Sequence, residues 1–392
     1  MAIGQIKEKE DTSIWIKAKK FGKSYTNIIG GFFGSYVYDR LIDDRIHNKP
    51  GSSFPELRRV GKRIIKKAKP DGEKKLIDEI DWYNLFKNTK LSKNLPKVYD
   101  FSTHPSNVFL EMKYYNYPSL RKIIMNDMNA QFFLKKRWAY LFKILKNSFY
   151  TPNNEISTSS NYVKKAHFNK WEDRINHITE ISPWFKSILK SPLLFINGKY
   201  YINSTVIMPH LKNDAHIVNN LTPKKLYISH GDLHTHNILC GVFPKDIIMI
   251  DWRGKSPNGD IYFDIAYDIA KLYHDLRSYY SLIEENYCNA FVYFDKNCIL
   301  VDYNILRKDL MEKFNLQFKF VNHLILENFA EDSSLEYRSL FTEAIHFLTM
   351  VPFHLNSKVE GICCYMVGVI RLNEWLEKYH YDVYQYLNIK YL

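Results

Sequence analysis

The chain has 392 residues, 46% of them hydrophobic, which is enough to bury the core of two or three ordinary domains. This composition excludes a disordered or fibrous protein. Lysine and arginine outnumber aspartate and glutamate by 55 to 42, and the formal net charge is +13. The basic excess favours an acidic partner, such as a nucleotide, a phosphorylated substrate or an anionic membrane face, without choosing among them.

The first 110 or so residues predict a small α+β lobe. Ile28 and Ile29 lead into a glycine cluster, and residues 73–86 have apolar side chains at helical spacing. Pro118 stands near the start of a further predicted helix over 118–125. Strand composition marks the remaining segments, which are residues 36–42, 63–68, 95–101 and 107–115.

From there onward the chain is predicted to be mostly helical. Residues 151–161 are the best linker candidate, because small polar side chains gather there between two aromatic-rich stretches. A pair of short strands is expected around 193–208, turning at Asn197 and Gly198. Beyond residue 265 nearly everything predicts helix.

The stretch that carries chemistry is residues 225–255. A strand at 226–228 leads into the polar loop HGDLHTHN, and two further short strands follow, the second ending at Asp251. This arrangement would bring Asp232, Asn237 and Asp251 together. Transfer of a γ-phosphoryl group needs an oriented acceptor hydroxyl and magnesium to neutralise the phosphates. Asp232 would accept the hydroxyl proton, and Asn237 and Asp251 would supply hard oxygen ligands for the metal.

HGDLHTHN followed by IDWRG resembles the catalytic loop and metal-binding motif of the aminoglycoside phosphotransferase and choline kinase-like superfamily. The combination of HGD, an asparagine five residues later and a second aspartate is specific, whereas HGD alone would be weak. The resemblance implies a bilobal protein-kinase-like α+β fold. Residues 1–112 would form a β-rich N-lobe and residues 113–392 a larger, mostly helical C-lobe. It also implies ATP as co-substrate and Mg²⁺ as cofactor.

The resemblance also implies a nucleotide site in the N-lobe. Gly30, Gly31, Gly34 and Ser35 would cover the phosphates. Lys66 and Lys67 point to opposite faces of a strand, so only one can reach the phosphates. Lys67 is preferred, because its spacing before EIDWY resembles related phosphotransferases, and Glu79 would be its partner.

Further roles are carried over by position. Backbone groups near Met112 and Tyr114 would bind the adenine edge, and Asp264 or Asp268 would brace the catalytic loop, with helix capping an equal alternative. Arg253 departs from the family pattern. It could contact phosphate or an anionic substrate, although a structural salt bridge is the more common role.

Two other classes compete with the kinase interpretation. The GDLH portion imitates metallophosphoesterases, and His230, His234 and His236 could bind a transition metal. Such an enzyme needs a later Asn-His motif, however, and no GNH follows. A pseudokinase scaffold is disfavoured because a base, two metal ligands and a lysine-glutamate pair are all present.

The sequence gives only hints of the acceptor. The basic balance suits a neutral or anionic acceptor, and similarity to bacterial surface-polysaccharide phosphotransferases favours a sugar or polyol for glycan assembly, with an amino alcohol as the alternative. Trp171, Arg174 and Trp184 lie in the segment expected to build the acceptor pocket.

The five cysteines lack metal-type spacing, and the charged N-terminus lacks the character of a signal peptide, so a cytoplasmic protein is expected. Nucleic acid binding and a membrane span are not expected, and peripheral membrane contact stays open.

Overall fold

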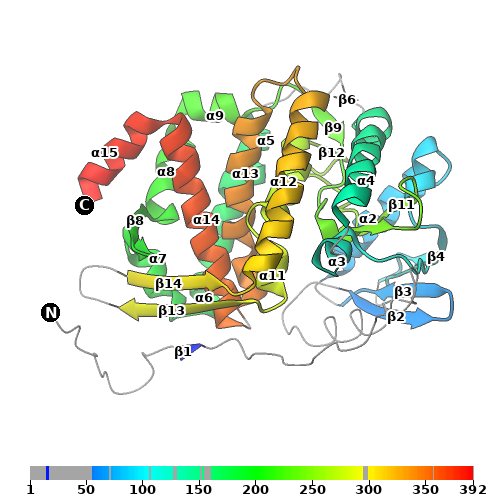
Figure 1. Ribbon diagram of the computed structural model, residues 1–392, viewed down its shortest axis with the longest axis horizontal. Coiled ribbons are helices and arrows are strands. Elements are labelled where there is room, and N and C mark those ends of the chain that lie inside the picture. Colours follow the sequence, from blue (N-terminus) through cyan, green and yellow to red (C-terminus); the bar gives the residue numbers. More distant parts are fainter. Residues whose placement is uncertain are drawn as a thin grey trace.

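The computed structural model describes residues 15–16, 55–69, 72–105, 107–126, 130–150, 152–153, 160–294, 299–355 and 357–391. The small-lobe sheet lies at one end of the molecule and the C-terminal helix α15 at the other (Figure 1). The α+β class with a small β-rich lobe and a larger, mostly helical lobe is confirmed.

The small lobe is an antiparallel sheet of four described strands with one helix. The strands follow the order β2-β3-β5-β4, with bounds β2 Glu56–Val60, β3 Arg63–Lys67, β5 Phe109–Lys113 and β4 Val98–Ser102. Helix α2 (Glu73–Phe86) has the predicted bounds and buries Leu76, Ile80 and Trp82. The short 3₁₀ helix η2 (Lys90–Asn94) leads from α2 to β4. The predicted lobe border between residues 112 and 113 falls at the end of β5.

The large lobe consists mainly of helices packed side by side, with α12, α13 and α14 as its long central members (Figure 1). The bounds are α3 Leu120–Asn126, α4 Ala130–Ile144, α5 Ser160–Val163, α6 Lys170–Ile181, α7 Phe185–Lys190, α8 Ser204–Asn213, α9 Ala215–Leu221, α10 Ile265–Leu276, α11 Tyr280–Glu284, α12 Lys308–Asn328, α13 Leu335–Met350, α14 Lys358–Tyr379 and α15 Tyr381–Tyr391. Single-turn segments fill some joints, namely η3 Leu145–Phe149, η4 Lys164–Asn169, η5 Thr235–Asn237 and η6 Val351–His354.

The large lobe also contains a sheet, of which the sequence predicted one hairpin but not the other. Strands β13 (Cys288–Phe294) and β14 (Ile299–Ile305) pair as an antiparallel hairpin beyond residue 265, so the expectation of nearly continuous helix there is wrong. Buried and more exposed residues alternate along β13, which is the two-residue period of a half-buried strand. The full order is β1-β13-β14-β7-β8, where β1 is Trp15–Ile16, β7 is Leu193–Ile196 and β8 is Lys199–Ile202.

The hairpin predicted near residue 197 is present. Strands β7 (Leu193–Ile196) and β8 (Lys199–Ile202) are joined by Asn197 and Gly198, both with positive φ, as a tight hairpin turn requires. The residues after 203 form α8 instead of continuing the strand. Within the proposed linker, β6 (Pro152–Asn153) pairs with β9 (Leu226–Ile228), which in turn pairs with β12 (Tyr262–Phe263).

One apolar core runs through both lobes, since α2 side chains belong to the same buried cluster as those of α13 and α14. Cys240, Cys288, Cys363 and Cys364 are buried free thiols, as expected for reduced cysteines, and Cys298 lies outside the described residues. In the described parts of the chain, no helix combines the length and apolar character needed to cross a bilayer.

Candidate active site

Two short strands bring Asp232, Asn237 and Asp251 together. β10 (Ile238–Cys240) follows the HGDLHTHN loop and pairs with β11 (Ile247–Met249), which delivers Asp251. The Asn237 carbonyl accepts a 3.0 Å bond from the Ile250 amide, and the Asn237 side-chain amide donates to the Asp232 carbonyl at 2.9 Å. The three predicted residues therefore surround one point in space.

Asp268 braces the start of the catalytic loop. Its carboxylate accepts the His230 amide at 2.8 Å and the Gly231 amide at 2.7 Å. Burial raises the pKa of Asp268 to about 7, and the two amide donors act against that rise. Asp264 does not serve the loop: it caps α10 through the Ala266 amide and pairs with Arg338 at 2.7 Å. The structure thus separates two aspartates that the sequence left as alternatives.

A second carboxylate, which the sequence did not single out, holds the far end of the loop. Asp275 accepts the Thr235 amide at 3.0 Å and also contacts the Thr235 hydroxyl and Ser281. Asp275 lies two helical turns after Asp268 on α10. This spacing in DIAYDIAKLYHD is the signal that could have identified Asp275, since residues seven apart share a helix face.

Lys66, and not Lys67, is the small-lobe lysine of the site. The Lys66 ammonium lies 2.6 Å from the Glu79 carboxylate and also contacts Asp251. Lys66 is 4% exposed, whereas Lys67 is exposed on the other face of β3. The preference for Lys67 is corrected, because the pleat of β3 turns Lys66 toward α2. Burial opposes the charge, but Asp251 and Glu79 hold the pKa of Lys66 above its usual range.

A stack of aromatic rings joins α2 to the catalytic motifs. Trp82 of α2 lies parallel to Trp252, with ring centroids 3.9 Å apart, and His230 and Phe149 pack against Trp252 at 4.3 and 4.9 Å. His230 also accepts a hydrogen bond from the Asp232 amide at 3.2 Å, so this histidine helps to hold the shape of the loop. Side chains from two lobes thereby fix the residue that follows Asp251.

Gly254 allows the metal-binding motif to touch α2 directly. A Cβ at this position, where φ is +80°, would lie 2.3 Å from the Asp78 carbonyl oxygen. Only glycine tolerates both the left-handed backbone and this approach. Asp251 itself has φ 60, an uncommon conformation that aspartate accepts more readily than most residues.

The Asp232 carboxylate is held ionised. Lys271 of α10 lies 2.9 Å from it, and His234 lies 3.9 Å away. Burial would raise the pKa of Asp232, but Lys271 and His234 outweigh burial and lower the pKa well below the usual range. Lys271 was not predicted, although it follows Asp268 by three residues on one face of α10.

The side chains present fit a magnesium ion shared with nucleotide phosphates. The side-chain amide nitrogen of Asn237 donates to the Asp232 carbonyl. The side-chain oxygen of Asn237 is therefore left for a cation. The Asp251 side chain is 43% exposed, and its pKa is lowered, since Lys66 outweighs the effect of burial. An amide oxygen and a carboxylate are the ligands that Mg²⁺ takes when phosphates and water supply the rest.

The other residues predicted to bind the nucleotide form two sets, of which only one lies within the described residues. Gly30, Gly31, Gly34 and Ser35 lie outside the described residues. Met112 lies inside β5, paired with Ile64 and Val98, and the Tyr114 amide donates to the Lys62 carbonyl at 2.9 Å. The Tyr114 amide therefore already serves the sheet, and the adenine contact assigned to Met112 and Tyr114 stays a prediction.

The sequence did not predict that several positive side chains would gather near Asp232. Lys170 donates to the Tyr267 hydroxyl at 3.1 Å and Arg253 donates to the same oxygen at 2.8 Å. Arg253 is adjacent to the catalytic loop, since a Cβ on Gly231 would lie 2.6 Å from the Arg253 Cβ. Arg253 therefore binds a phenol, and the salt bridge considered for it is not formed among the described residues.

The pKa of the Tyr267 hydroxyl should be sensitive to these positive charges. Burial opposes ionisation, but Arg253, Lys170 and Lys271 lower the pKa of Tyr267 to about 8, and the facing His346 is kept neutral by burial and by Lys271. A pKa below that of the unfolded chain stabilises the fold as pH rises from about 8 toward 10. Near-ultraviolet difference absorbance should show one tyrosine ionising near pH 8, and Tyr267→Phe should lose that step. An identical titration in the variant would contradict this assignment.

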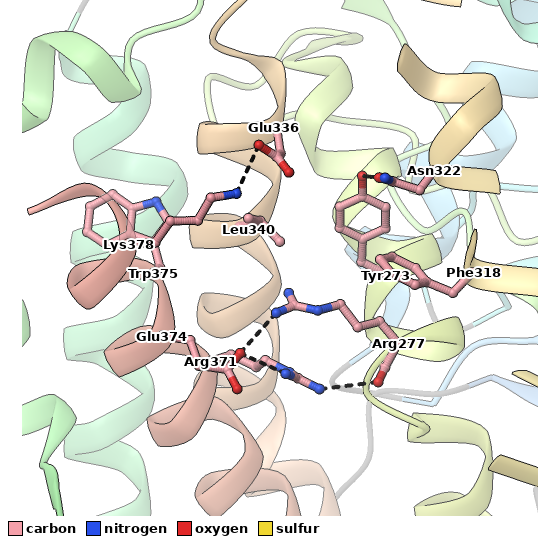
Figure 2. A pocket seen from close by; sticks show the side chains of 10 residues that line it. All are labelled: Tyr273, Arg277, Phe318, Asn322, Glu336, Leu340, Arg371, Glu374, Trp375 and Lys378. Atoms are coloured by element: carbon pink, nitrogen blue, oxygen red, sulfur yellow. Dashed lines mark hydrogen bonds and ion pairs between the residues drawn. The ribbon is translucent and has the colours of Figure 1, made fainter. Parts of the chain in front are cut away.

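A partly open pocket of about 280 Å³ lies between α10, α12, α13 and α14 (Figure 2). Its charges are paired with one another. Glu374 binds Arg277 at 2.9 Å and Arg371 at 2.7 Å, and Lys378 binds Glu336 at 3.1 Å. These internal ion pairs leave little charge to select a ligand, and none of the lining residues belongs to the candidate active site.

No family model and no curated protein matches the chain. Two solved structures are similar over most of both chains. The ADP-bound aminoglycoside phosphotransferase APH(2'')-Ib is 12% identical, with 86% of this chain and 98% of that chain covered at a TM-score of 0.46. A choline kinase from Cryptosporidium parvum Iowa II is 13% identical, with 89% and 97% covered at a TM-score of 0.40. At this level of similarity, residue roles have to be argued from the geometry of this chain.

Proposed function

We propose that the chain is an ATP-dependent, magnesium-requiring phosphotransferase that phosphorylates a hydroxyl group of a small molecule. One observation supports this above all: the Lys66–Glu79 pair of the small lobe meets Asp251, which lies beside Asn237 and Asp232. A phosphate-binding lysine, two metal ligands and a base in one place are the parts that phosphoryl transfer requires.

Each residue would have a separate task. Lys66 would bind the α- and β-phosphates, with Glu79 holding its ammonium group in position. Asn237 and Asp251 would hold Mg²⁺, which neutralises charge on the phosphates when bound. Asp232 would orient the acceptor hydroxyl and accept its proton. Residues 1–112 would bind the nucleotide, with Gly30, Gly31, Gly34 and Ser35 over the phosphates, and residues 113–392 would bind the acceptor.

We propose that the acceptor is a sugar or polyol and that its phosphorylation serves surface glycan synthesis. The enzyme itself would be located in the cytoplasm. The similarity to an aminoglycoside phosphotransferase and to a choline kinase leaves an amino alcohol as the second candidate. The positive charge beside Asp232 favours the sugar or polyol, because a cationic acceptor would be repelled there.

A metallophosphoesterase is less well supported. Such an enzyme holds its metals with clusters of His, Asp and Glu, and the described residues contain no group of three such side chains able to bind a metal. The kinase needs only two protein ligands, because the nucleotide supplies the others. An inactive scaffold would have no reason to maintain the buried Lys66–Glu79 pair beside two candidate metal ligands.

Nucleotide binding gives the first test. Mg·ATP at 100 times its dissociation constant should stabilise the folded protein by about 2.7 kcal/mol, and ATP with a chelator should stabilise it less. Thermal unfolding followed with ATP and with GTP measures this directly. Absence of stabilisation by either nucleotide would remove the basis of the proposal.

Turnover gives the second test. Sugars, polyols and amino alcohols would be screened for acceptor-dependent ADP formation, with Asp232→Asn as the inactive control. Phosphate release from an aryl phosphate in the presence of Mn²⁺, without ATP, would instead favour the hydrolase.

A further inference from the structure

We infer that the acceptor carries an anionic group, a carboxylate or a phosphate, which binds a cationic cluster formed by Lys170, Arg174, Arg253 and Lys271. This inference rests on the proposed phosphotransferase function, because it places the cluster on the acceptor side of Asp232. It also narrows the acceptor class, since it favours an acidic or phosphorylated sugar over a neutral sugar and over a cationic amino alcohol.

Three separate elements build the cluster. Helix α6 contributes Lys170 and, four residues later, Arg174, whose guanidinium lies 4.8 Å from the Phe353 ring centre and whose pKa is lowered by burial and by the nearby Arg253. Helix α10 contributes Tyr267 and Lys271 with the same spacing. Arg253 comes from the segment after β11, where its amide is bound to the His230 carbonyl at 3.0 Å. Side chains that converge from three elements form a built site and not a run of surface charge.

The Tyr267 hydroxyl connects Lys170 of α6 with Arg253. It accepts hydrogen bonds from Lys170 and Arg253, and the Lys170 ammonium and the Arg253 guanidinium lie 5.4 and 5.5 Å from the Tyr267 ring centre. Two cations are thus held on one neutral phenol. Like charges so close repel each other, and an anion between them would remove that cost.

Few carboxylates compensate this charge. Lys271 pairs with Asp232. Asp173, the residue before Arg174 in α6, opposes through its negative charge the lowering of the Arg174 pKa by burial. The ion pairs found among the described residues include neither Lys170 nor Arg253. Lys170 and Arg174 also stand at i and i+4 on α6, an arrangement that destabilises a helix when the charges are alike. A ligand anion would account for this arrangement.

The neighbouring histidines add no charge. Burial keeps His167, His274 and His346 neutral by lowering their pKa values, that of His167 to about 3, and nearby lysines act in the same direction. The positive charge of the region therefore comes from its lysine and arginine side chains, although burial lowers the pKa of Lys170 to about 8.

The nucleotide is not the expected occupant. Lys66 contacts Glu79 and Asp251, whereas the cluster adjoins Asp232 through Lys271 and Gly231 through Arg253. An anion bound at Lys170 and Arg174 would lie on the side from which the acceptor hydroxyl approaches Asp232. The cluster would then fix the orientation of the acceptor.

Inorganic phosphate is the probe for the cluster, used on the full chain with the nucleotide site filled by saturating Mg·ADP. Phosphate binding should raise the pKa of Tyr267 from its position near 8, because an anion opposes the effect of Lys170 and Arg253. Lys170→Met and Arg174→Met should each weaken phosphate binding about tenfold or more, as expected for loss of a charge-assisted hydrogen bond. Lys165→Met, which removes an exposed charge from the preceding segment, is the matched control.

The outcomes separate the two proposals. Retained Mg·ADP binding shows that a variant is folded. The anion site would be overturned if phosphate left Tyr267 unchanged, if the cluster variants bound phosphate as the wild type does, or if they lost ADP instead. An adventitious ion only, bound equally by the Lys165→Met and Lys170→Met proteins, would count against it too. Phosphate binding without any acceptor turnover would support the site while failing the phosphotransferase proposal.

Discussion

Asp232→Asn is expected to lower the rate of phosphoryl transfer by about 10²- to 10⁴-fold, the contribution of a general base. The amide has nearly the same shape as the carboxylate but cannot accept the hydroxyl proton. Mg·ATP affinity should stay close to that of the wild type, because the Asp232 side chain contacts Lys271 and not Lys66. Initial rates and nucleotide titrations measure the two effects separately.

The control for this variant is Asp302→Asn, which removes one carboxylate from an exposed position on β14. It should leave the rate unchanged. Because both variants alter the net charge equally, a difference between them reports position and not charge. An Asp232→Asn enzyme as active as the wild type would show that another group accepts the proton.

The second large effect is expected at Lys66. Lys66→Met should reduce activity by at least about 100-fold and should lower the free energy of unfolding by about 3–5 kcal/mol, because it leaves the buried Glu79 carboxylate without its partner. Lys67→Met removes the same charge one residue later, on the exposed face of β3. It should change stability by less than about 0.5 kcal/mol and leave activity nearly intact.

The Lys66 and Lys67 pair is a test within a single strand, because composition and charge change identically. Urea denaturation gives the stabilities and Mg·ATP titration the nucleotide affinities. Glu79→Gln keeps Lys66 and its contact with Asp251, so it separates loss of the ion pair from loss of the lysine. Equal losses in the Lys66→Met and Lys67→Met proteins would refute the assignment of Lys66.

Local pattern predicted much of the fold. Helix α2 begins and ends where its apolar spacing indicates, and the turn at Asn197 and Gly198 was predictable because both residues tolerate positive φ. The loop containing Asp232 and Asn237 was recognisable because both residues lie within one short motif. In each case the deciding interactions are between residues close in sequence.

The errors come from interactions that sequence spacing does not define. Lys66 and Lys67 are neighbours in sequence, and only the packing of β3 against α2 decides which of them meets Glu79. The hairpin of β13 and β14 was taken for helix because its aromatic and aliphatic residues suit either state until a partner strand is known. The cationic cluster was missed as a group because its members come from α6, α10 and the segment after β11.

The stack of Trp82 on Trp252 bears on how the chain folds. Helix α2 buries its tryptophan against the large lobe, so part of its apolar face is covered only while the two lobes are packed together. The small lobe therefore should not behave as an autonomous folding unit, even though its residues would have a separate task in binding. Its unfolding would expose Trp252 and release Gly254 from α2. Unfolding of the two lobes is therefore expected to be coupled.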